Sequence, residues 1–332
     1  MLCGGADSIV LATGYDRLEA REGEYPYCRC TGCGLVSRKT SPEAEDIGAL
    51  YPEAYPPHRT VGQRKSERLV NRLAIEYVYG VESLSRPWMW RLLARALCRR
   101  IMKNTQRPRG ANRLLDVGCG AGRRLERYRR LGWKVCGIDI NARAVEACRR
   151  TGLEVHHGTV FDAPYPGGTF DLVCLDHVIE HLLAPARVLE RAAEFLAPRG
   201  KIVLTSPNSR GIGFLLYRSC WFHLDAPRHL FLFDPHTIRL LASQAGLLTR
   251  KVVTRSSPVS LCRSRHYAMT QGHTLPGDLA ARRAVLERSA RSRKPHRMYR
   301  RLVWPLTACC ALFGRGDVLE AEFTIAGQAD NR

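Results

Sequence analysis

Residues 114–122 read LLDVGCGAG, and this stretch decides the fold. An apolar strand runs into alternating glycines, and a helix with apolar spacing follows them. A second apolar stretch at 134–138 then leads directly to Asp139. Glycines allow a tight turn and let a ligand approach the backbone closely, and an acid after the second strand is placed to bind ribose hydroxyls. The combination predicts a nucleoside-containing cofactor at one edge of a parallel sheet.

Strands and helices alternate from this stretch to the C-terminal end. Apolar segments predict seven strands, at 113–117, 134–138, 153–157, 170–175, 201–205, 248–254 and 320–326. Segments with apolar residues at helical spacing predict helices at 123–131, 142–151, 184–196 and 235–245. The alternation predicts an α/β fold, namely a Rossmann-like, seven-stranded, mostly parallel sheet with helices on both faces.

The chain divides into three regions by composition. Residues 1–57 are rich in Cys, Gly, Pro and Tyr and predict a small cysteine-rich module. Residues 58–110 combine helical periodicity with a linker, and we expect two bridging helices there. Residues 111–332 hold the predicted sheet. Within them, 255–317 is a long excursion before the last strand, with helices expected at 277–290 and 298–313.

The excursion at 255–317 allows two interpretations. It packs as a helical lid over the substrate side of the sheet, or it contacts a membrane surface through arginines beside an apolar helix face. We favour the lid, because insertions after the strands of such sheets usually shape binding sites.

Length and cysteine content limit the classes to which the protein can belong. A chain of 332 residues suits about two domains and can bury a sizeable core. The thirteen cysteines are an odd number without a recognisable export signal, so we expect no disulfide framework. The longest apolar run, 302–313, is shorter than the roughly 20 residues of a transmembrane helix. These features predict a cytoplasmic protein.

The formal net charge of +21 would suit a nucleic acid, an anionic membrane face or a phosphorylated substrate. The basic residues are 45 arginines and 7 lysines, spread along the chain except for a denser run at 282–301. Dispersed arginine is more typical of a solvated surface than of a binding stripe. We therefore do not expect nucleic acid as a partner.

The glycine loop resembles that of a known enzyme family. Dinucleotide-binding loops use G-x-G-x-x-G, whereas this loop reads acid-x-G-x-G-x-G from Asp116, as in class I methyltransferases that depend on S-adenosylmethionine (SAM). Residues 170–182, FDLVCLDHVIEHL, resemble the fourth-strand motif of the branch with the ubiquinone-biosynthesis O-methyltransferases and the type 11, 12 and 23 methyltransferase domains. Residues 196–201, LAPRGK, resemble its L-x-P-G-G turn, with Arg199 where glycine is usual.

The resemblance implies which residues contact the cofactor. The methionine end is expected to contact Asp116, Gly118, Cys119, Gly120 and Gly122. The rest of the cofactor is expected to contact Asp139 at the ribose, Ile140, Thr159 and Val160 around the adenine, and His177 near the reacting methyl. The family usually has an acid near Thr159, so Asp162 or backbone groups are expected to select the adenine.

Methyl transfer from a sulfonium requires the protein to align the acceptor and to remove any acceptor proton. Imidazole is the natural base near neutral pH. The candidates are His177, His181, His223 and His229. We favour His229, with His177 as an alternative and His181 either catalytic or only packed against the helix turn that contains it.

Residues 221–230, WFHLDAPRHL, resemble a loop of a bacterial subgroup associated with surface-polysaccharide or secondary-metabolite pathways. In that subgroup a cysteine-rich module precedes the catalytic domain. Here Cys30 and Cys33 form one zinc-knuckle spacing, while the second pair is incomplete at Cys3. Either a partner precedes Met1, or Cys28 supplies the fourth thiolate, or no zinc binds.

The sequence therefore predicts a SAM-dependent methyltransferase that acts on a small-molecule or sugar-containing acceptor, on oxygen. Two alternatives remain open. The first is an RNA methyltransferase, supported only by the charge. The second is a non-catalytic protein that binds SAM or interacts through a zinc module, because a cofactor site does not by itself prove turnover.

Overall fold

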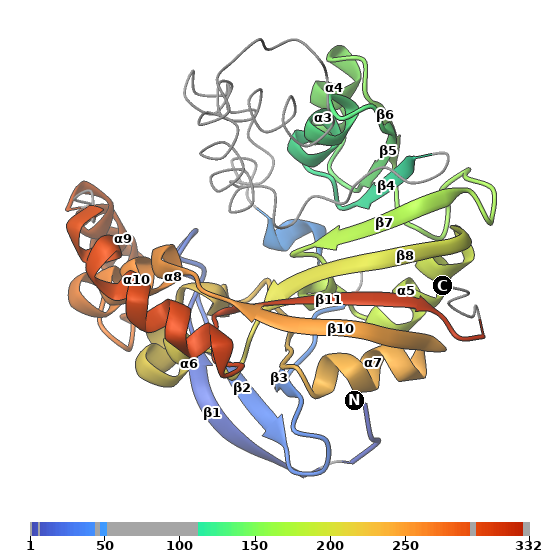
Figure 1. Ribbon diagram of the computed structural model, residues 1–332. Coiled ribbons are helices and arrows are strands. Elements are labelled where there is room, and N and C mark those ends of the chain that lie inside the picture. The colour runs from blue at the N-terminus through green and yellow to red at the C-terminus, as the bar shows by residue number, and fades with distance from the viewer. Residues whose placement is uncertain (1, 6, 44–46, 52–111, 293–296, 328–332) are drawn as a thin grey trace, which may run out of the picture.

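The computed structural model describes residues 2–5, 7–43, 47–51, 112–292 and 297–327 (Figure 1). The bridging helices predicted within 58–110 lie outside the described residues. In the part of the chain that is described, no helix combines the length and the hydrophobicity that crossing a bilayer requires. The twelve described cysteines are all free thiols.

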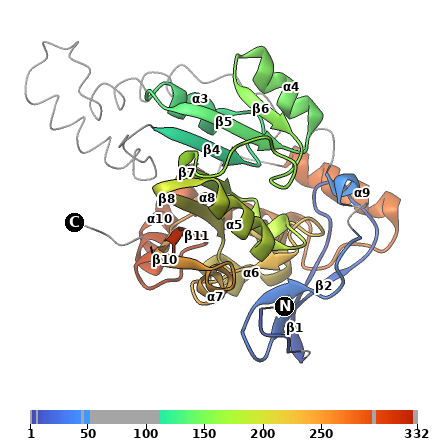
Figure 2. The same cartoon turned by 90° about the vertical axis from the view of Figure 1, so that its right-hand side faces the viewer.

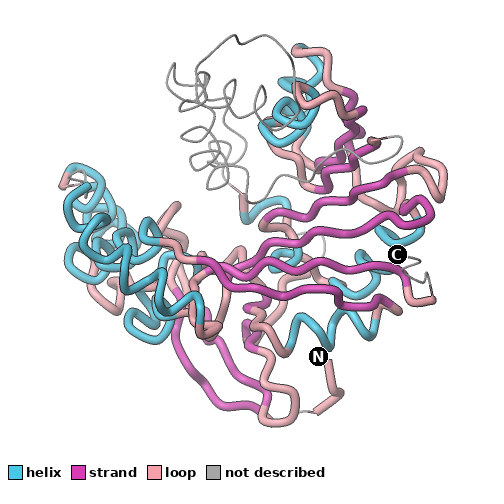
Figure 3. Tube along the Cα trace, in the orientation of Figure 1, coloured by secondary structure: helices cyan, strands magenta, loops and turns pink. Residues whose placement is uncertain are grey.

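The larger sheet has seven strands in the order β10-β11-β8-β7-β4-β5-β6 (Figure 3). Their bounds are β4 Arg113–Val117, β5 Lys134–Asp139, β6 Glu154–His157, β7 Phe170–Asp176, β8 Leu196–Pro207, β10 Leu247–Arg255 and β11 Val318–Ile325. Every neighbouring pair from β6 to β8 is parallel, whereas β11 runs antiparallel to both β8 and β10. The predicted seven-stranded, mostly parallel sheet is confirmed.

Helices cover both faces of this sheet (Figure 2). They are α3 Arg123–Arg129 and α4 Ala142–Arg150 on one face, and α5 Pro185–Glu194 and α7 Thr237–Gln244 on the other. The alternation along β7 explains the two cores. Leu172 and Cys174 pack in the cluster that includes α3 and α4, while Val173 and Leu175 pack in the cluster that includes α5 and α7.

The predicted helix at 184–196 ends earlier, at Glu194, because β8 already begins at Leu196. The strand is longer than predicted, since the L-x-P-R-G turn forms part of it. Arg199 has a φ of 67°, a left-handed conformation that explains why glycine is usual at this position.

The N-terminal module forms a second sheet in the order β1-β2-β3-β9. Its strands are β1 Ser8–Gly14, β2 Tyr25–Cys30, β3 Val36–Arg38 and β9 Phe231–Leu232. The last strand comes from the C-terminal half of the chain, and Val36 of β3 pairs with Leu232 of β9. The module is therefore joined to the sheet domain through shared strand hydrogen bonds.

Three helices lie between β10 and β11, namely α8 Pro258–Thr270, α9 Leu279–Arg291 and α10 Arg297–Leu312. They lie on the side to which the β7 arrow points in Figure 1, which is the carboxyl edge of the parallel strands. The sequence predicted α9 and α10 but not α8. The buried side of α8 carries Ser260, Ser264 and His266, so this helix lacks the apolar periodicity that the prediction relied on.

Candidate functional site

The glycine loop between β4 and α3 is held against β5. The backbone N–H groups of Gly118 and Cys119 donate to the carbonyl of Ile138, at 2.8 and 3.1 Å. Gly118, Gly120 and Gly122 have φ angles of 68°, 50° and 71°, which side chains rarely adopt. A Cβ on Gly118 would lie 2.5 Å from Cγ2 of Val178, so the loop also requires glycine for close packing.

Asp139, the last residue of β5, faces the glycine loop. Its Oδ2 accepts a hydrogen bond of 2.6 Å from the Gly120 N–H, and its Oδ1 accepts one of 2.8 Å from the Asn141 N–H. Each carboxylate oxygen can accept a further hydrogen bond. The next side chain, Ile140, is 54% exposed and presents an apolar surface beside the carboxylate.

Asp116 lies buried in β4, directly before the loop. Its Oδ1 has no hydrogen-bond partner among the described residues. Nε of Arg124, in the first turn of α3, lies 3.4 Å from that oxygen, while Nη2 of Arg124 lies 2.5 Å from Oδ2 of Asp176 at the end of β7. Burial raises the pKa of Asp116 to about 7, although the charge of Arg124 acts in the opposite direction.

The residues expected around an adenine follow β6. The backbone N–H of Thr159 donates to Oδ1 of Asp162 at 2.7 Å, and the Thr159 hydroxyl contacts the same oxygen. These hydrogen bonds and one with His156 hold the pKa of Asp162 well below its usual range. Val160 is buried. Asp162 is thus already engaged by its neighbours, although its side chain is 55% exposed.

The four candidate histidines come together at the carboxyl edge of the sheet. His177 follows β7, His181 ends the short helix η4 Ile179–His181, His223 lies in η6 Phe222–Leu224, and His229 lies in the loop beyond it. The rings of His181 and His229 meet edge to face with centroids 4.5 Å apart, and those of His177 and His223 stack at 5.8 Å. His177 adopts a left-handed φ of 56°, a strained conformation that is common at functional sites.

Glu180 lies at the centre of this cluster and was not predicted from the sequence. Its side chain is fully buried, and Nδ1 of His177 donates to its Oε1 at 2.9 Å while the Ser206 hydroxyl donates to its Oε2 at 3.1 Å. The sequence feature that could have identified Glu180 is its position three residues after His177 and directly before His181.

Burial and charge separate the pKa values of these groups. Burial alone would lower the pKa of His177, but its hydrogen bond to Glu180 raises it. Burial would raise the pKa of Glu180, but His177 lowers it to about 2. Burial, aided by the charge of His229, lowers the pKa of His181 to about 4. Burial also lowers the pKa of His223 well below its ordinary value.

The N-terminal module contributes to the same cluster. The hydroxyl of Tyr51 lies 2.9 Å from Nδ1 of His181, a contact between residues too far apart in sequence to be predicted. Arg228 bridges Asp225 at 2.8 Å and Asp16 at 3.1 Å. Both Arg228 and Asp16 are buried, so this ion pair joins the module to the histidine loop.

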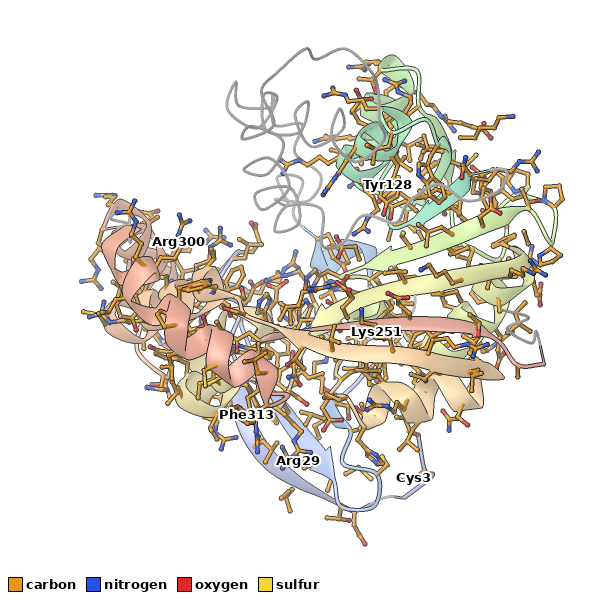
Figure 4. All side chains as sticks on the ribbon, viewed as in Figure 1. Cys3, Arg29, Tyr128, Lys251, Arg300 and Phe313 are labelled. Carbon is orange, nitrogen blue, oxygen red and sulfur yellow. The ribbon has the colours of Figure 1, made fainter. Side chains whose placement is uncertain are left out.

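Three of the four candidate metal-binding cysteines lie together. The sulfur atoms of Cys3, Cys30 and Cys33 form one cluster, with 3.4 Å between Sγ of Cys3 and Sγ of Cys30. Backbone N–H groups and the neighbouring thiols lower the pKa of Cys30 to about 7. Cys28, also expected as a ligand, is not part of this cluster. Cys3, labelled in Figure 4, lies beside α7, where Gln244 donates to the carbonyl of Leu2.

Comparison with protein families gives one match, of residues 89–252 to the model described as a methyltransferase domain. The ubiquinone biosynthesis O-methyltransferase of Rhodopseudomonas palustris (strain BisA53) is 34% identical over 131 residues, which are 36% of this chain and 51% of that protein. The enzyme of the same name from Xanthomonas axonopodis pv. citri (strain 306) is 35% identical over 116 residues, or 33% and 48% of the two chains.

The chain thus spans about half the length of the curated relatives that it matches. Among solved structures, a SAM-dependent methyltransferase from Archaeoglobus fulgidus aligns with a TM-score of 0.43 and 20% identity. That alignment covers 70% of this chain and 93% of the other.

Proposed function

We propose that this chain is a class I SAM-dependent methyltransferase that transfers a methyl group from SAM to an oxygen atom of a small-molecule or sugar-containing acceptor. The match of residues 89–252 to the methyltransferase-domain model supports this proposal. The observation that carries the proposal is the buried carboxylate of Asp116, whose Oδ1 lacks a hydrogen-bond donor among the described residues beside the glycine loop. An ammonium group satisfies such a carboxylate, and the methionine end of SAM carries one.

The neighbouring residues fit the other parts of the cofactor. Asp139 points to the loop and retains acceptor capacity for the two ribose hydroxyls. The exposed side chain of Ile140 suits the flat face of an adenine. Thr159 and Val160 lie at the end of the adjoining strand β6, where the adenine edge is expected.

SAM supplies, when bound, a methyl group on a positively charged sulfur that departs as a neutral thioether. The residues of the chain align the acceptor oxygen and take its proton. His177 is suited to the second task, because Glu180 accepts its Nδ1–H and Nε2 therefore carries the lone pair. Nε2 of His177 would take the proton of the acceptor oxygen as that oxygen is methylated.

This assignment differs from the sequence preference for His229. The side chain of His177 is 37% exposed and follows β7 directly, beside the glycine loop, whereas that of His229 is 6% exposed. His229 donates through Nδ1 to the carbonyl of His223 at 2.8 Å. We assign to His181 and His229 contact with the acceptor rather than proton transfer.

Zinc in the N-terminal module forms a second part of the proposal. Cys3, Cys30 and Cys33 offer three sulfur ligands, and the lowered pKa of Cys30 favours the thiolate that zinc requires. Structural zinc is tetrahedral, so a fourth ligand comes from water or from outside the described residues. Metal analysis of the purified protein and of a Cys33→Ser variant tests this assignment.

Calorimetric titration with SAM and with S-adenosylhomocysteine tests the cofactor site. We expect both to bind, and no binding of either would contradict the proposed function. Transfer of a labelled methyl group into cell extracts then identifies the acceptor. Treatment of the labelled product with base distinguishes methyl esters, which are saponified, from methyl ethers, which are stable.

A His177→Gln variant tests the proton acceptor. We expect kcat to fall by about 10²-fold or more while the Kd for SAM stays unchanged, because positioned general bases contribute that much. His236→Gln, at an exposed position away from the cluster, is the matched control. Unchanged kcat in His177→Gln would transfer the role to another group.

A further inference from the structure

Glu180, His181 and His229 each place one ligand atom within 4.8 Å of the other two. We propose that these three residues bind one divalent transition-metal ion, zinc or an ion of similar chemistry, and that this ion coordinates an acceptor with two adjacent hydroxyl groups. The part concerning the acceptor rests on the function proposed above. The metal site itself rests on the geometry of the three side chains.

The two imidazoles are oriented as metal ligands usually are. Nδ1 of His181 lies 3.1 Å from the carbonyl of Arg228 and 2.9 Å from the hydroxyl of Tyr51. Because a carbonyl can only accept, this nitrogen carries the proton, and the Tyr51 oxygen shares it. Nδ1 of His229 donates to the carbonyl of His223 at 2.8 Å. A backbone carbonyl that accepts from one ring nitrogen sets the tautomer, and it leaves the lone pair of the other nitrogen available to a metal. Each ring therefore keeps Nε2 for a metal, and Nε2 of His229 also lies 3.9 Å from Oδ2 of Asp225.

The carboxylate of Glu180 is held in the same manner. Its two oxygens accept hydrogen bonds from Nδ1 of His177 and from the hydroxyl of Ser206, and each oxygen keeps further acceptor capacity. Hydrogen bonds to a ligating carboxylate fix its orientation and are part of a typical metal site.

The ligand set indicates the class of ion. Two imidazoles and one carboxylate bind zinc in catalytic sites and non-haem iron in oxygenases, whereas calcium and magnesium prefer oxygen ligands. Three protein ligands leave coordination positions open. His181 is only partly buried.

An acceptor with two adjacent hydroxyl groups, as in a catechol or a sugar diol, could occupy two open positions. Coordination to a divalent ion lowers the pKa of a bound hydroxyl, which favours transfer of its proton to His177, the residue that donates to Glu180. The site therefore selects vicinal diols over isolated hydroxyls.

Metal counting tests the site. Metal-free protein is titrated with Co²⁺, and bound ions are counted after dialysis in the wild type, in a His181→Gln/His229→Gln double variant and in His273→Gln, an exposed control. We expect the double variant to hold one ion fewer than the wild type and the control. Cobalt at the cysteine cluster is recognised separately by its thiolate charge-transfer absorption. An equal count in all three proteins overturns the proposal.

The folded state and the cofactor site are followed independently. Circular dichroism shows whether the double variant folds, and calorimetry shows whether it binds SAM. If the double variant does not fold, the single His181→Gln variant, which keeps two of the three ligands, is the second test. We expect the affinity of the His181→Gln variant for Co²⁺ to fall at least tenfold while SAM binding is retained. Unchanged affinity would overturn the proposal.

Catechol and phenol, added to the Co²⁺ protein with S-adenosylhomocysteine, test the acceptor class. We expect catechol, but not phenol, to change the visible cobalt absorption, and only in protein that keeps both His181 and His229. No change with catechol contradicts diol coordination. Metal binding without any SAM binding would instead contradict the proposed function and leave the metal site standing, so the two failures are distinguishable.

Discussion

Asp116 is a buried carboxylate with an oxygen that no described residue satisfies, and such a group lowers the stability of the folded protein. Proteins retain strained or unsatisfied groups chiefly at functional sites. The same reasoning applies to His177, whose φ of 56° places a bulky side chain in a conformation that favours glycine. Both residues lie at the carboxyl ends of neighbouring strands, where the cofactor and the acceptor are proposed to meet.

An Asp116→Asn variant should change the pH dependence of stability. The pKa of Asp116 is about 7 in the folded protein, against an ordinary value near 3.8, so folding favours its protonated form. Its unfavourable contribution is absent below pH 4, grows as pH rises, and reaches about 2–4 kcal/mol above pH 7. Arg124 partly neutralises the ionised form, whereas Asp139 and Asp176 oppose ionisation.

We therefore expect Asp116→Asn to be more stable than the wild type at pH 8 but not at pH 4, and to bind SAM weakly. Urea unfolding at both pH values measures this difference. Glu190→Gln, an exposed acid on α5, is the control. A constant difference between wild type and variant across this range would contradict the argument.

Gly118→Ala separates backbone strain from steric contact. Gly118 and Gly168 have nearly the same φ, 68° and 69°, but a Cβ meets Val178 at 2.5 Å only at Gly118. Alanine in the left-handed region costs about 1–2 kcal/mol at either site. We expect Gly118→Ala to lose about 1–3 kcal/mol more than Gly168→Ala, as overpacked sites do, in urea unfolding. Equal losses would mean that Val178 moves without cost.

At the scale of elements, the module and the histidine loop depend on each other. Strand β9 completes the small sheet, and the hydroxyl of Tyr27 in β2 donates to the carbonyl of His229 at 2.7 Å. Arg38 of β3 donates to the carbonyl of Pro227 at 3.0 Å. The module thus fixes the backbone on both sides of Arg228, and with it the position of the His229 ring.

An Asp16→Asn variant tests this coupling. It removes one of the two carboxylates around buried Arg228, and breaking a buried ion pair costs about 3 kcal/mol. We expect a comparable loss in the free energy of unfolding, together with weaker methyl transfer because His229 is displaced. Glu287→Gln, in an exposed pair with Arg291, should cost less than about 0.5 kcal/mol. Similar effects of both substitutions would contradict the coupling.

For the whole molecule, the structure accounts for part of the high arginine content. Arg124 and Arg228 bridge pairs of carboxylates, Arg255 pairs with Glu320 at 2.5 Å, and Arg282 is buried. Arg300, labelled in Figure 4 on the helices between β10 and β11, belongs to the denser basic run. The most exposed large apolar side chains of the described residues, Leu302, Leu312 and Phe313, lie on or directly after α10 and are each at least 75% exposed.

The N-terminal module and the sheet domain should unfold together. Cys30, Cys33 and Leu35 of the module pack in the same core cluster as Val188 and Leu189 of α5. A shared core and a shared sheet make separate unfolding unfavourable. We expect one calorimetric transition whose van't Hoff and calorimetric enthalpies agree. Two resolved transitions would indicate an independent module.

The sequence alone determined the local fold that carries the proposed cofactor site. The strand, glycine loop, helix and acid of 113–139 are local in sequence, and their periodicity and glycine spacing follow directly from backbone geometry. The mostly parallel sheet of seven strands was equally accessible, because strands that alternate with helices favour parallel pairing.

Only the tertiary structure decided the acceptor half. Glu180 accepts hydrogen bonds from His177 and from Ser206 of β8, and Tyr51 reaches His181 across 130 positions in sequence. The periodicity of apolar residues in the sequence does not reveal such contacts, since they depend on how distant segments pack. Helix α8 escaped prediction for a related reason, because its buried residues include polar ones. Two polar side chains of the helix, His266 and Thr270, form hydrogen bonds with Ser289 of α9. Local patterns report where the chain turns and which face is apolar, whereas packing determines which polar groups meet.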